Sequence, residues 1–390
     1  MEGSLQIGRL FDIPVRLHWT FLIVIPLFAW IIGSQIELTA DLLEGLTRTF
    51  AAVFGVPALA LTIDRSIFTG SQVIPYILGA IVSIGLFVGV LIHELAHSLL
   101  AKRKGIKINS ITLLILGGVS SMEENIPDPR VELPMALAGP LMSLVLGVIS
   151  FGLMYGTSFF SVSPGFNGAW IFTWGYLGLL NVILFVFNLL PAFPMDGGRV
   201  LRAWLATKMP LSRATKIAAD IGKGFAVFFG IFGFLVLNPI LIIIAFFIYI
   251  GANQEFIQVK YNILLRDLRV ADILSKPVIT VSPSTPIKKV MELMYSTKHL
   301  GFPVIENDIL IGMVTLSDIQ KASSIDRDAM QVKDIMTRNP IILPQTAPVV
   351  DALRLMSRFN IGRIPVTDGN TLLGIITRAD ILKVMELRDV

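Results

Sequence analysis

His93-Glu94-Leu95-Ala96-His97 follows twenty uncharged residues, Val73 to Ile92, and Lys102-Arg103-Lys104 comes shortly after it. A run of this length and character is sufficient to cross a bilayer as a helix. Two imidazoles and a carboxylate therefore lie in a segment that is typical of a membrane span, where a charge at the helix centre costs roughly 2.5–3.5 kcal/mol. Ionisable groups persist in such a place only with a partner or a function. The alternative interpretation, two core histidines beside a chance glutamate, gives them neither.

The spacing of these residues suits a metal ion. Positions i and i+4 of a helix lie on one face, about 5–6 Å apart at Cβ. His93 and His97 can therefore hold one zinc ion, and Glu94 can reach a water molecule beside it. This is the H-E-x-x-H arrangement of zinc metalloproteases.

The composition indicates that at least half of the chain lies in a bilayer. Of 390 residues, 54% are hydrophobic and only 15% are charged, and the mean hydropathy is +0.74, unlike an ordinary soluble protein. The net charge of +4 comes without a basic cluster interleaved with aromatic residues, so we expect no nucleic-acid partner. The chain has no cysteine, and a metal site must use His, Asp or Glu.

Basic residues set the expected orientation in the cell membrane. Lys102-Arg103-Lys104 and the basic residues between 199 and 216 should lie inside, which places both termini in the cytoplasm. Within residues 34–72, the apolar part is only about fifteen residues long and contains Pro57. It is too short for a crossing, and we expect a re-entrant or interfacial segment. The six expected spans are approximately 19–33, 77–101, 131–155, 169–190, 225–237 and 240–252.

Residues 105–128 alternate weakly between apolar and polar and contain Gly117-Gly118, which predicts one or two strands. Strands at membrane depth are tolerated only where they line a cavity or bury against protein. A strand edge beside a metal could receive a peptide by strand addition. The alternative is an ordinary cytoplasmic hairpin.

Zinc in a catalytic site needs a third protein ligand and keeps one position for water. Asp196 is the best candidate, because it follows Pro191 and Pro194, which break the end of the fourth span. An Asp-Gly pair alone would be interpreted as a turn, but the incomplete pair of histidines favours the ligand. With zinc bound, Glu94 would take the proton of the attacking water and pass it to the leaving amine. Asn188 could donate a hydrogen bond to the substrate or the oxyanion, or it could simply join two helices.

Short motifs in the first 253 residues form one pattern: His93-Glu94-Leu95-Ala96-His97, Asn188-Leu189-Leu190-Pro191 with Asp196-Gly197, Arg16-Leu17-His18-Trp19, Gly117-Gly118 and Ala138-Gly139-Pro140. The pattern resembles the site-2 proteases, a family of intramembrane zinc metalloproteases. The resemblance implies one zinc ion per chain on His93, His97 and Asp196, with Glu94 as the catalytic base. It also implies that a transmembrane segment of a substrate is cleaved within the bilayer. Residues 34–72 depart from the family pattern.

Near Leu264 the sequence changes to a soluble α/β character, and an internal repeat begins. Val270-Ala271-Asp272-Ile273 recurs 62 positions later as Val332-Lys333-Asp334-Ile335, and the segment Gly312–Asp318 recurs at Gly374–Asp380 with the same offset. Each unit is typical of the order helix, strand, turn, strand, helix. We therefore expect three domains, at 1–256, 264–323 and 326–390.

The two repeats resemble a pair of cystathionine-β-synthase-type (CBS) domains, which often bind adenine nucleotides and commonly associate in twos. In that family the Thr and Asp of Gly-h-x-Thr-x-x-Asp contact phosphate and ribose. The matching positions are Thr315 and Asp318, and Thr377 and Asp380. A local alternative exists, because Thr followed three residues later by an acidic residue also caps a helix. An adenine nucleotide and a homodimer through these domains are hypotheses.

We therefore expect a polytopic α-helical membrane protein of about six spans with a cytoplasmic α/β CBS pair. Its expected function is hydrolysis of peptide bonds within or near transmembrane segments of membrane proteins, modulated by a ligand of the CBS pair. The first alternative is a CBS-regulated metal-ion transporter or channel, which predicts ion-binding groups spread along a path rather than one compact set. The second is an inactive membrane scaffold.

Overall fold

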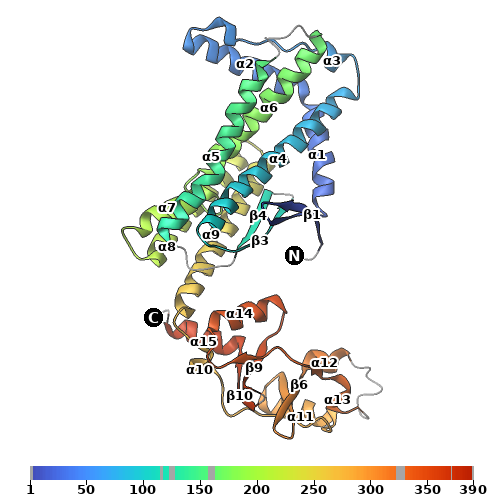
Figure 1. Ribbon diagram of the computed structural model, residues 1–390, viewed down its shortest axis with the longest axis vertical. Coiled ribbons are helices and arrows are strands. Elements are labelled where there is room, and N and C mark those ends of the chain that lie inside the picture. The colour runs from blue at the N-terminus through green and yellow to red at the C-terminus, as the bar shows by residue number, and fades with distance from the viewer. Residues whose placement is uncertain are drawn as a thin grey trace. The chain divides into compact units, whose positions relative to one another are not determined.

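The computed structural model describes residues 3–114, 117–122, 128–156, 163–321, 330–369 and 371–388. The chain divides into two compact units, Met1–Ile257 and Gln258–Val390, and each is described by itself (Figure 1). Parts of the expected strand region 105–128, of the expected loop between the third and fourth spans, and of the edges of both expected repeats lie outside the described residues.

Long apolar helices form most of the first unit (Figure 1). In the described part of the chain, five helices are long and apolar enough to cross a membrane, and a sixth crossing exists if α1 and α2, bent by 69° at a short break, count as one. The six-span topology therefore stays a prediction. The helices of this unit are α1 Phe21–Ser34, α2 Ile36–Phe54, α3 Ser66–Thr69, α4 Ile74–Arg103, α5 Pro129–Met154, α6 Pro164–Asn188, α7 Asp196–Ala206 and α8 Leu211–Leu235, with a short 3₁₀ turn at Pro57–Leu59. Helix α9, Pro239–Leu265, begins in this unit and ends in the second.

The last two helices are longer than the apolar runs at 225–237 and 240–252 suggested. The run 225–237 covers the apolar end of α8, whose first half is more polar, and the run 240–252 covers the apolar start of α9, whose last part is more polar. The tight break between them lies where expected, because the side chain of Asn238 accepts hydrogen bonds from the amides of Ile240 and Leu241 at 3.0 and 3.3 Å. Pro239, which lacks an amide hydrogen, is suited to the first helical position.

Helix α4 is the centre of the first unit and packs against α1, α5 and α6. Small residues permit this close packing. A Cβ at Gly85 would lie 2.8 Å from the side chain of Leu177 on α6, and a Cβ at Gly79 would meet the backbone of α1 at Ala29. The sequence of α4 therefore allows neighbouring helices to approach on several sides.

A four-stranded sheet lies beside α4, in the order β1-β2-β3-β4. Strands β3 and β4 confirm the strands predicted within 105–128. Strands β1 and β2 were not predicted. Strand β2 pairs in parallel with β3, Val15 opposite Ile111, so its partner comes almost a hundred residues later. The strands are β1 Ser4–Leu10, β2 Ile13–His18, β3 Ile108–Leu114 and β4 Gly117–Met122.

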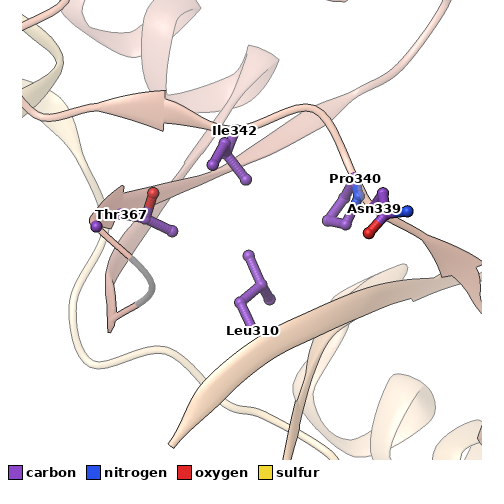
Figure 2. Close-up of a pocket in the computed structure, with 6 residues that line it drawn as sticks. Leu310, Asn339, Pro340, Ile342 and Thr367 are labelled. Carbon is purple, nitrogen blue, oxygen red and sulfur yellow. The ribbon is translucent and has the colours of Figure 1, made fainter.

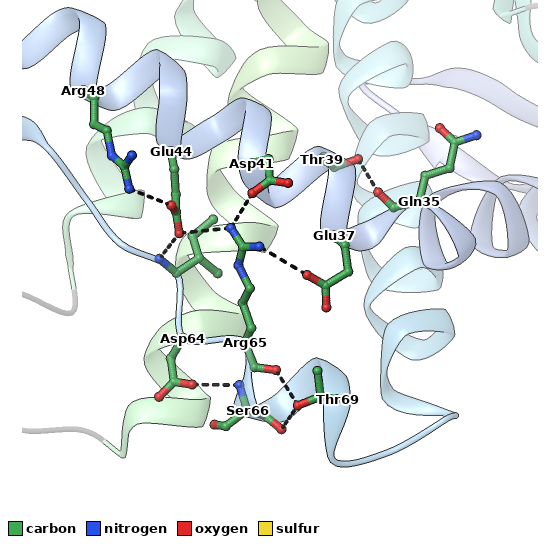
Figure 3. A network of polar contacts seen from close by, with 11 residues as sticks. Gln35, Glu37, Thr39, Asp41, Glu44, Arg48, Asp64, Arg65, Ser66 and Thr69 are labelled. Carbon is green, nitrogen blue, oxygen red and sulfur yellow. Dashed lines mark hydrogen bonds and ion pairs between the residues drawn. The ribbon is translucent and has the colours of Figure 1, made fainter.

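The stretch 34–72 forms helix α2 and a loop that is held against it by polar contacts. Arg65 lies among carboxylates of α2, with 2.5 Å to Asp41 and 3.4 Å to Glu37 (Figure 3). The side chain of Glu44 accepts a hydrogen bond from the amide of Ile63 at 2.9 Å. The apolar run from 49 to 63 is therefore not one element, because α2 ends inside it at Phe54 and a loop follows.

The second unit consists of two similar halves, each with its own apolar core. The 62-residue offset of the sequence also appears in the contacts. Thr337 of the second half pairs with Met313 of the first, and Ser275 of the first half pairs with Ile375 of the second. Each half thus adds the equivalent short segment to the edge of the other half's sheet. The elements are α10 Val270–Ile273, α11 Ile287–Thr297, β5 Gly301–Glu306, β6 Ile309–Thr315, α12 Leu316–Lys321, α13 Val332–Ile335, β7 Thr337–Arg338, β8 Leu343–Pro344, α14 Val349–Arg358, β9 Arg363–Asp368, β10 Thr371–Thr377 and α15 Arg378–Arg388.

Candidate metal and catalytic site

His93, His97 and Asp196 come together in the first unit. The histidines lie one turn apart on α4, and Asp196 is the first residue of α7. The two Nε2 atoms are 3.2 Å apart, and Asp196 Oδ2 lies 3.2 Å from that of His93 and 3.0 Å from that of His97. Both imidazoles are buried. Among the described residues, these three form a group that could hold a metal ion.

The separations between the three ligand atoms suit zinc. Zn–N and Zn–O bonds of roughly 2.0–2.2 Å in a tetrahedral site place neighbouring ligand atoms about 3.3–3.6 Å apart. The observed 3.0–3.2 Å is slightly tighter than this. Small outward shifts of the side chains would therefore accommodate the ion.

Hydrogen bonds to the far side of each imidazole orient the ring. His97 Nδ1 lies 2.7 Å from the carbonyl oxygen of Met135 on α5. A carbonyl only accepts, so Nδ1 carries a hydrogen, and in the neutral imidazole Nε2 then presents a lone pair. His93 Nδ1 lies 2.9 Å from the hydroxyl of Ser143 on the same helix, which can accept in the same way. The Nε2 lone pairs of the two neutral imidazoles and the Asp196 carboxylate repel one another at this distance. A bound cation would attract all three groups and remove that repulsion.

The break after α6 determines the position of Asp196. Two prolines prevent a continuous helix, and the chain turns through a segment in which Ala192 and Phe193 are fully buried. Gly197 and Gly198 let the start of α7 press against this segment, because a Cβ at Gly198 would lie 2.6 Å from the amide nitrogen of Phe193. The Asp-Gly-Gly sequence thus begins helix α7 next to the histidines rather than forming a simple turn.

Gly139 lets helix α5 approach the two imidazoles. A Cβ at this position would lie 2.6 Å from His93 Nε2 and would overlap His97 Nε2. Real Cβ atoms do not tolerate such contacts, so any side chain at 139 would displace the metal-binding nitrogens. The space that the metal needs is therefore provided by a glycine.

Glu94 lies against the edge strand β4. Its Oε2 accepts a hydrogen bond from the hydroxyl of Ser120 at 3.1 Å, and that hydroxyl also contacts Ser98 on α4 at 2.9 Å. A Cβ at Gly118 would overlap the side chain of Glu94. The strand therefore holds the carboxylate beside the pair of histidines while leaving it space.

Asn188 is the last residue of α6, and its described hydrogen bond is local. The amide nitrogen of its side chain donates to the carbonyl of Leu184 at 2.9 Å. This contact brings it neither to the two histidines nor to Asp196. A role of Asn188 in holding substrate or oxyanion stays a prediction.

The candidate nucleotide residues of the CBS pair are engaged in helix caps. Asp318 Oδ2 accepts from the amide of Thr315 at 2.9 Å and from its hydroxyl at 2.7 Å. Asp380 and Thr377 repeat both contacts at the same distances. The capping alternative is thus realised in both halves. It does not exclude nucleotide binding, because Thr and Asp keep further acceptor sites.

A small pocket in the second unit is lined by other residues (Figure 2). Its volume is about 190 Å³, and none of the four candidate nucleotide residues lines it. Its walls are apolar or neutral, so they offer no charge for a phosphate. They consist of Leu310, Asn339, Pro340, Ile342, Thr367 and Gly369.

Sequence patterns had not indicated the residues that support the site. Ser143, Met135 and Ser120 contact the site residues from other elements, and no spacing rule connects them to His93, His97 or Glu94. Gly118 and Gly139 belong to small-residue motifs visible in the sequence, but a motif does not say what the glycine faces. Only the packing of α4 against α5 and β4 reveals these roles.

A site of two histidines and an aspartate, with a glutamate beside them among apolar helices, defines a membrane zinc metalloprotease. Comparison with known proteins agrees: the model of peptidase family M50 matches residues 81–229, and the CBS domain model matches 270–325 and 332–387. Zinc metalloprotease MJ0392 of Methanocaldococcus jannaschii is 34% identical over 388 residues, which cover 99% of this chain and 97% of that protein. The chain belongs to peptidase family M50, the site-2 proteases, and carries a CBS domain pair.

Two solved structures match parts of the chain. A site-2 protease from Methanocaldococcus jannaschii is 38% identical to this chain, and the match covers 65% of this chain and 95% of the protease, with a TM-score of 0.41. The CBS domain pair of protein MJ0100, in complex with 5′-methylthioadenosine and S-adenosyl-L-methionine, is 31% identical. This match covers 31% of this chain and 98% of the CBS pair, with a TM-score of 0.29.

Proposed function

We propose that this zinc metalloprotease hydrolyses peptide bonds within or near the transmembrane segments of membrane proteins, as in regulated intramembrane proteolysis. One observation carries the proposal: His93, His97 and Asp196 place their ligand atoms 3.0–3.2 Å apart, and Glu94 lies beside them on a helix apolar enough to cross a bilayer. Polar groups of this kind are retained in such a helix when they have a task. We assign one zinc ion per chain to this site.

The residues around the site divide the chemistry between them. Zinc, when bound, would polarise the scissile carbonyl and lower the pKa of water. Glu94, oriented by Ser120, accepts a proton from the attacking water and delivers it to the leaving amine as the C–N bond breaks. The Met135 carbonyl and the Ser143 hydroxyl hold the imidazoles in the orientation that keeps Nε2 toward the metal.

Strand β4 supports a mode of substrate binding. It is the last strand of its sheet, and Gly118 and Ser120 of this strand contact Glu94. An extended peptide that pairs with its free edge would lie beside the catalytic carboxylate. Main-chain pairing recognises a backbone rather than particular side chains, so a transmembrane substrate segment has to unwind before it is cleaved.

The CBS pair is assigned a regulatory role in the same proposal. We infer that an adenine nucleotide binds it through Thr315, Asp318, Thr377 and Asp380 and modulates hydrolysis, and that two chains associate through these domains. The proposal includes three domains, at 1–256, 264–323 and 326–390. It also includes six spans in the cell membrane, with both termini and the CBS pair in the cytoplasm. Basic residues at the end of α4 and in α7 and α8 support the orientation.

The test compares the wild type with Glu94→Gln, a variant of nearly the same shape. Each protein is purified in detergent and incubated with a panel of single-span substrates, and products are mapped by mass spectrometry. We expect cleavage within or next to the span by the wild type only. Cleavage by both proteins would remove Glu94 from the mechanism. Transport of zinc into liposomes by the wild type, without cleavage of any substrate, would support a transporter instead.

A further inference from the structure

A buried ionic network lies outside the metal site and has no part in the chemistry described so far. Arg202 of α7 donates from Nε to Glu132 Oε1 of α5 at 2.9 Å, and its Nη2 reaches the same oxygen. Its Nη1 donates to Glu255 Oε1 of α9 at 2.9 Å. Arg202 and Glu132 are each 3% exposed. One guanidinium thus joins three helices.

Such a network needs an explanation other than stability. Removing charges from water costs more than a buried ion pair commonly returns, and apolar residues of similar size often serve stability equally well. A planar guanidinium with two carboxylates does, however, fix geometry, because its donors have a rigid arrangement. A network of this kind therefore suits a place where relative position matters.

The network lies between the elements that build the metal site. Arg202 follows Asp196 by six residues on α7, or about 9 Å along a helix. Glu132 precedes Met135 by three residues on α5, and the carbonyl of Met135 orients His97. The Arg202–Glu132 pair therefore connects the helix that carries the aspartate to the helix that orients a histidine.

The guanidinium also contacts the segment that leads into α7. Its central carbon lies 5.0 Å from the centre of the Phe193 ring, and Phe193 is fully buried in the break before Asp196. A cation over an aromatic face is attracted to it. Arg202 is therefore held from both sides, by carboxylates of α5 and α9 and by the turn that positions Asp196.

We propose that Arg202 is a positioning residue of the zinc site: with Glu132 and Glu255 it sets α7 against α5 and so fixes Asp196 Oδ2 relative to the two histidines. The inference rests on the metal site of the proposed function, but it concerns affinity for zinc rather than hydrolysis. It predicts a defect in metal binding when the network is altered, although none of its residues touches the metal.

The experiment measures zinc affinity of the full chain in detergent by competition with a chromophoric chelator, together with the visible spectrum after cobalt substitution. Arg202→Lys keeps the charge but cannot reproduce the planar set of bonds. We expect its zinc affinity to fall about 10- to 100-fold, as is typical when a residue that supports ligands is changed, with an altered cobalt spectrum. Glu132→Gln, which keeps the shape of the partner, provides a second variant in case Arg202→Lys does not fold.

Arg65→Gln is the control, because it removes three ion pairs of an arginine at a partly exposed position that does not contact the site. It should retain the wild-type affinity and cobalt spectrum. Wild-type zinc affinity and spectrum in folded Arg202→Lys and Glu132→Gln would overturn the proposal. A fall in zinc affinity in a protein that cleaves no substrate would leave the positioning role intact and would count against the proposed function alone.

Discussion

At the scale of single residues, Gly139 provides a sensitive test of the site. We expect Gly139→Ala to abolish zinc binding, because its Cβ would overlap the Nε2 atoms of His93 and His97. Elemental analysis of the purified protein measures the effect. Gly152→Ala on the same helix is the control, since no atom lies within 4 Å of the added Cβ, and it should keep its zinc. A full zinc complement in Gly139→Ala would show that the observed packing is not that of the metal-bound protein.

Ser143 provides a milder test. The Ser143→Ala variant loses the hydrogen bond of 2.9 Å to His93 Nδ1, and partners of this kind typically contribute 10- to 100-fold in metal affinity. We expect a decrease in zinc affinity of that size, measured by chelator competition. Ser150, which is also buried on α5, offers a comparison: Ser150→Ala should bind zinc as the wild type does, and an equal loss in both variants would point to general destabilisation of the helix.

Spacing predicted His93, Glu94 and His97, the need for a third ligand predicted Asp196, and the structure places the three ligands together with Glu94 beside them. The helical period places His93 and His97 on one face and Glu94 at the adjoining position, so local geometry is enough for these three. Asp196 required only that an incomplete metal site needs another ligand. Ser143 and Gly139 could not be predicted, because their roles depend on how α5 packs against α4.

At the scale of elements, polar contacts hold the loop that follows α2 against that helix (Figure 3). We expect Arg65→Gln to loosen the loop from 55 to 73, since Arg65 is bound to Asp41 and Glu37. The loss of stability should be below about 1 kcal/mol, because these partners are partly solvated. Faster hydrogen exchange confined to the loop and α2 would confirm this, whereas unchanged exchange would show that the contacts do not hold the loop.

Sequence patterns predicted the long apolar helices better than the strands. Residues 77–101 and 131–155 are almost coextensive with α4 and α5, because twenty apolar residues in a bilayer leave the backbone few alternatives to a helix. Strand β2 has no such constraint. Its pairing with β3 depends on contacts far away in the chain, and no local period identifies it.

At the scale of the whole molecule, nucleotide binding by the CBS pair provides a test of the proposed regulation. We expect Asp318→Ala and Asp380→Ala each to weaken binding of AMP or ATP by the full chain, measured by calorimetry, because each removes a carboxylate that can accept from ribose hydroxyls. Loss of the cap should also lower stability, by roughly 0.5–2 kcal/mol. Asp351→Ala, at an exposed ion pair with Arg354, is the control. A change in unfolding without a change in nucleotide affinity would assign these residues to capping alone.

The measurement that tests the central claim most directly determines zinc content and cleavage in the same preparations of wild type, Glu94→Gln and Asp196→Asn. The structure predicts about one zinc ion per chain in the wild type and in Glu94→Gln, little in Asp196→Asn, and cleavage of a single-span substrate by the wild type alone. Full zinc in Asp196→Asn would contradict the assigned ligand set. Cleavage by Glu94→Gln at the wild-type rate would contradict the assigned chemistry.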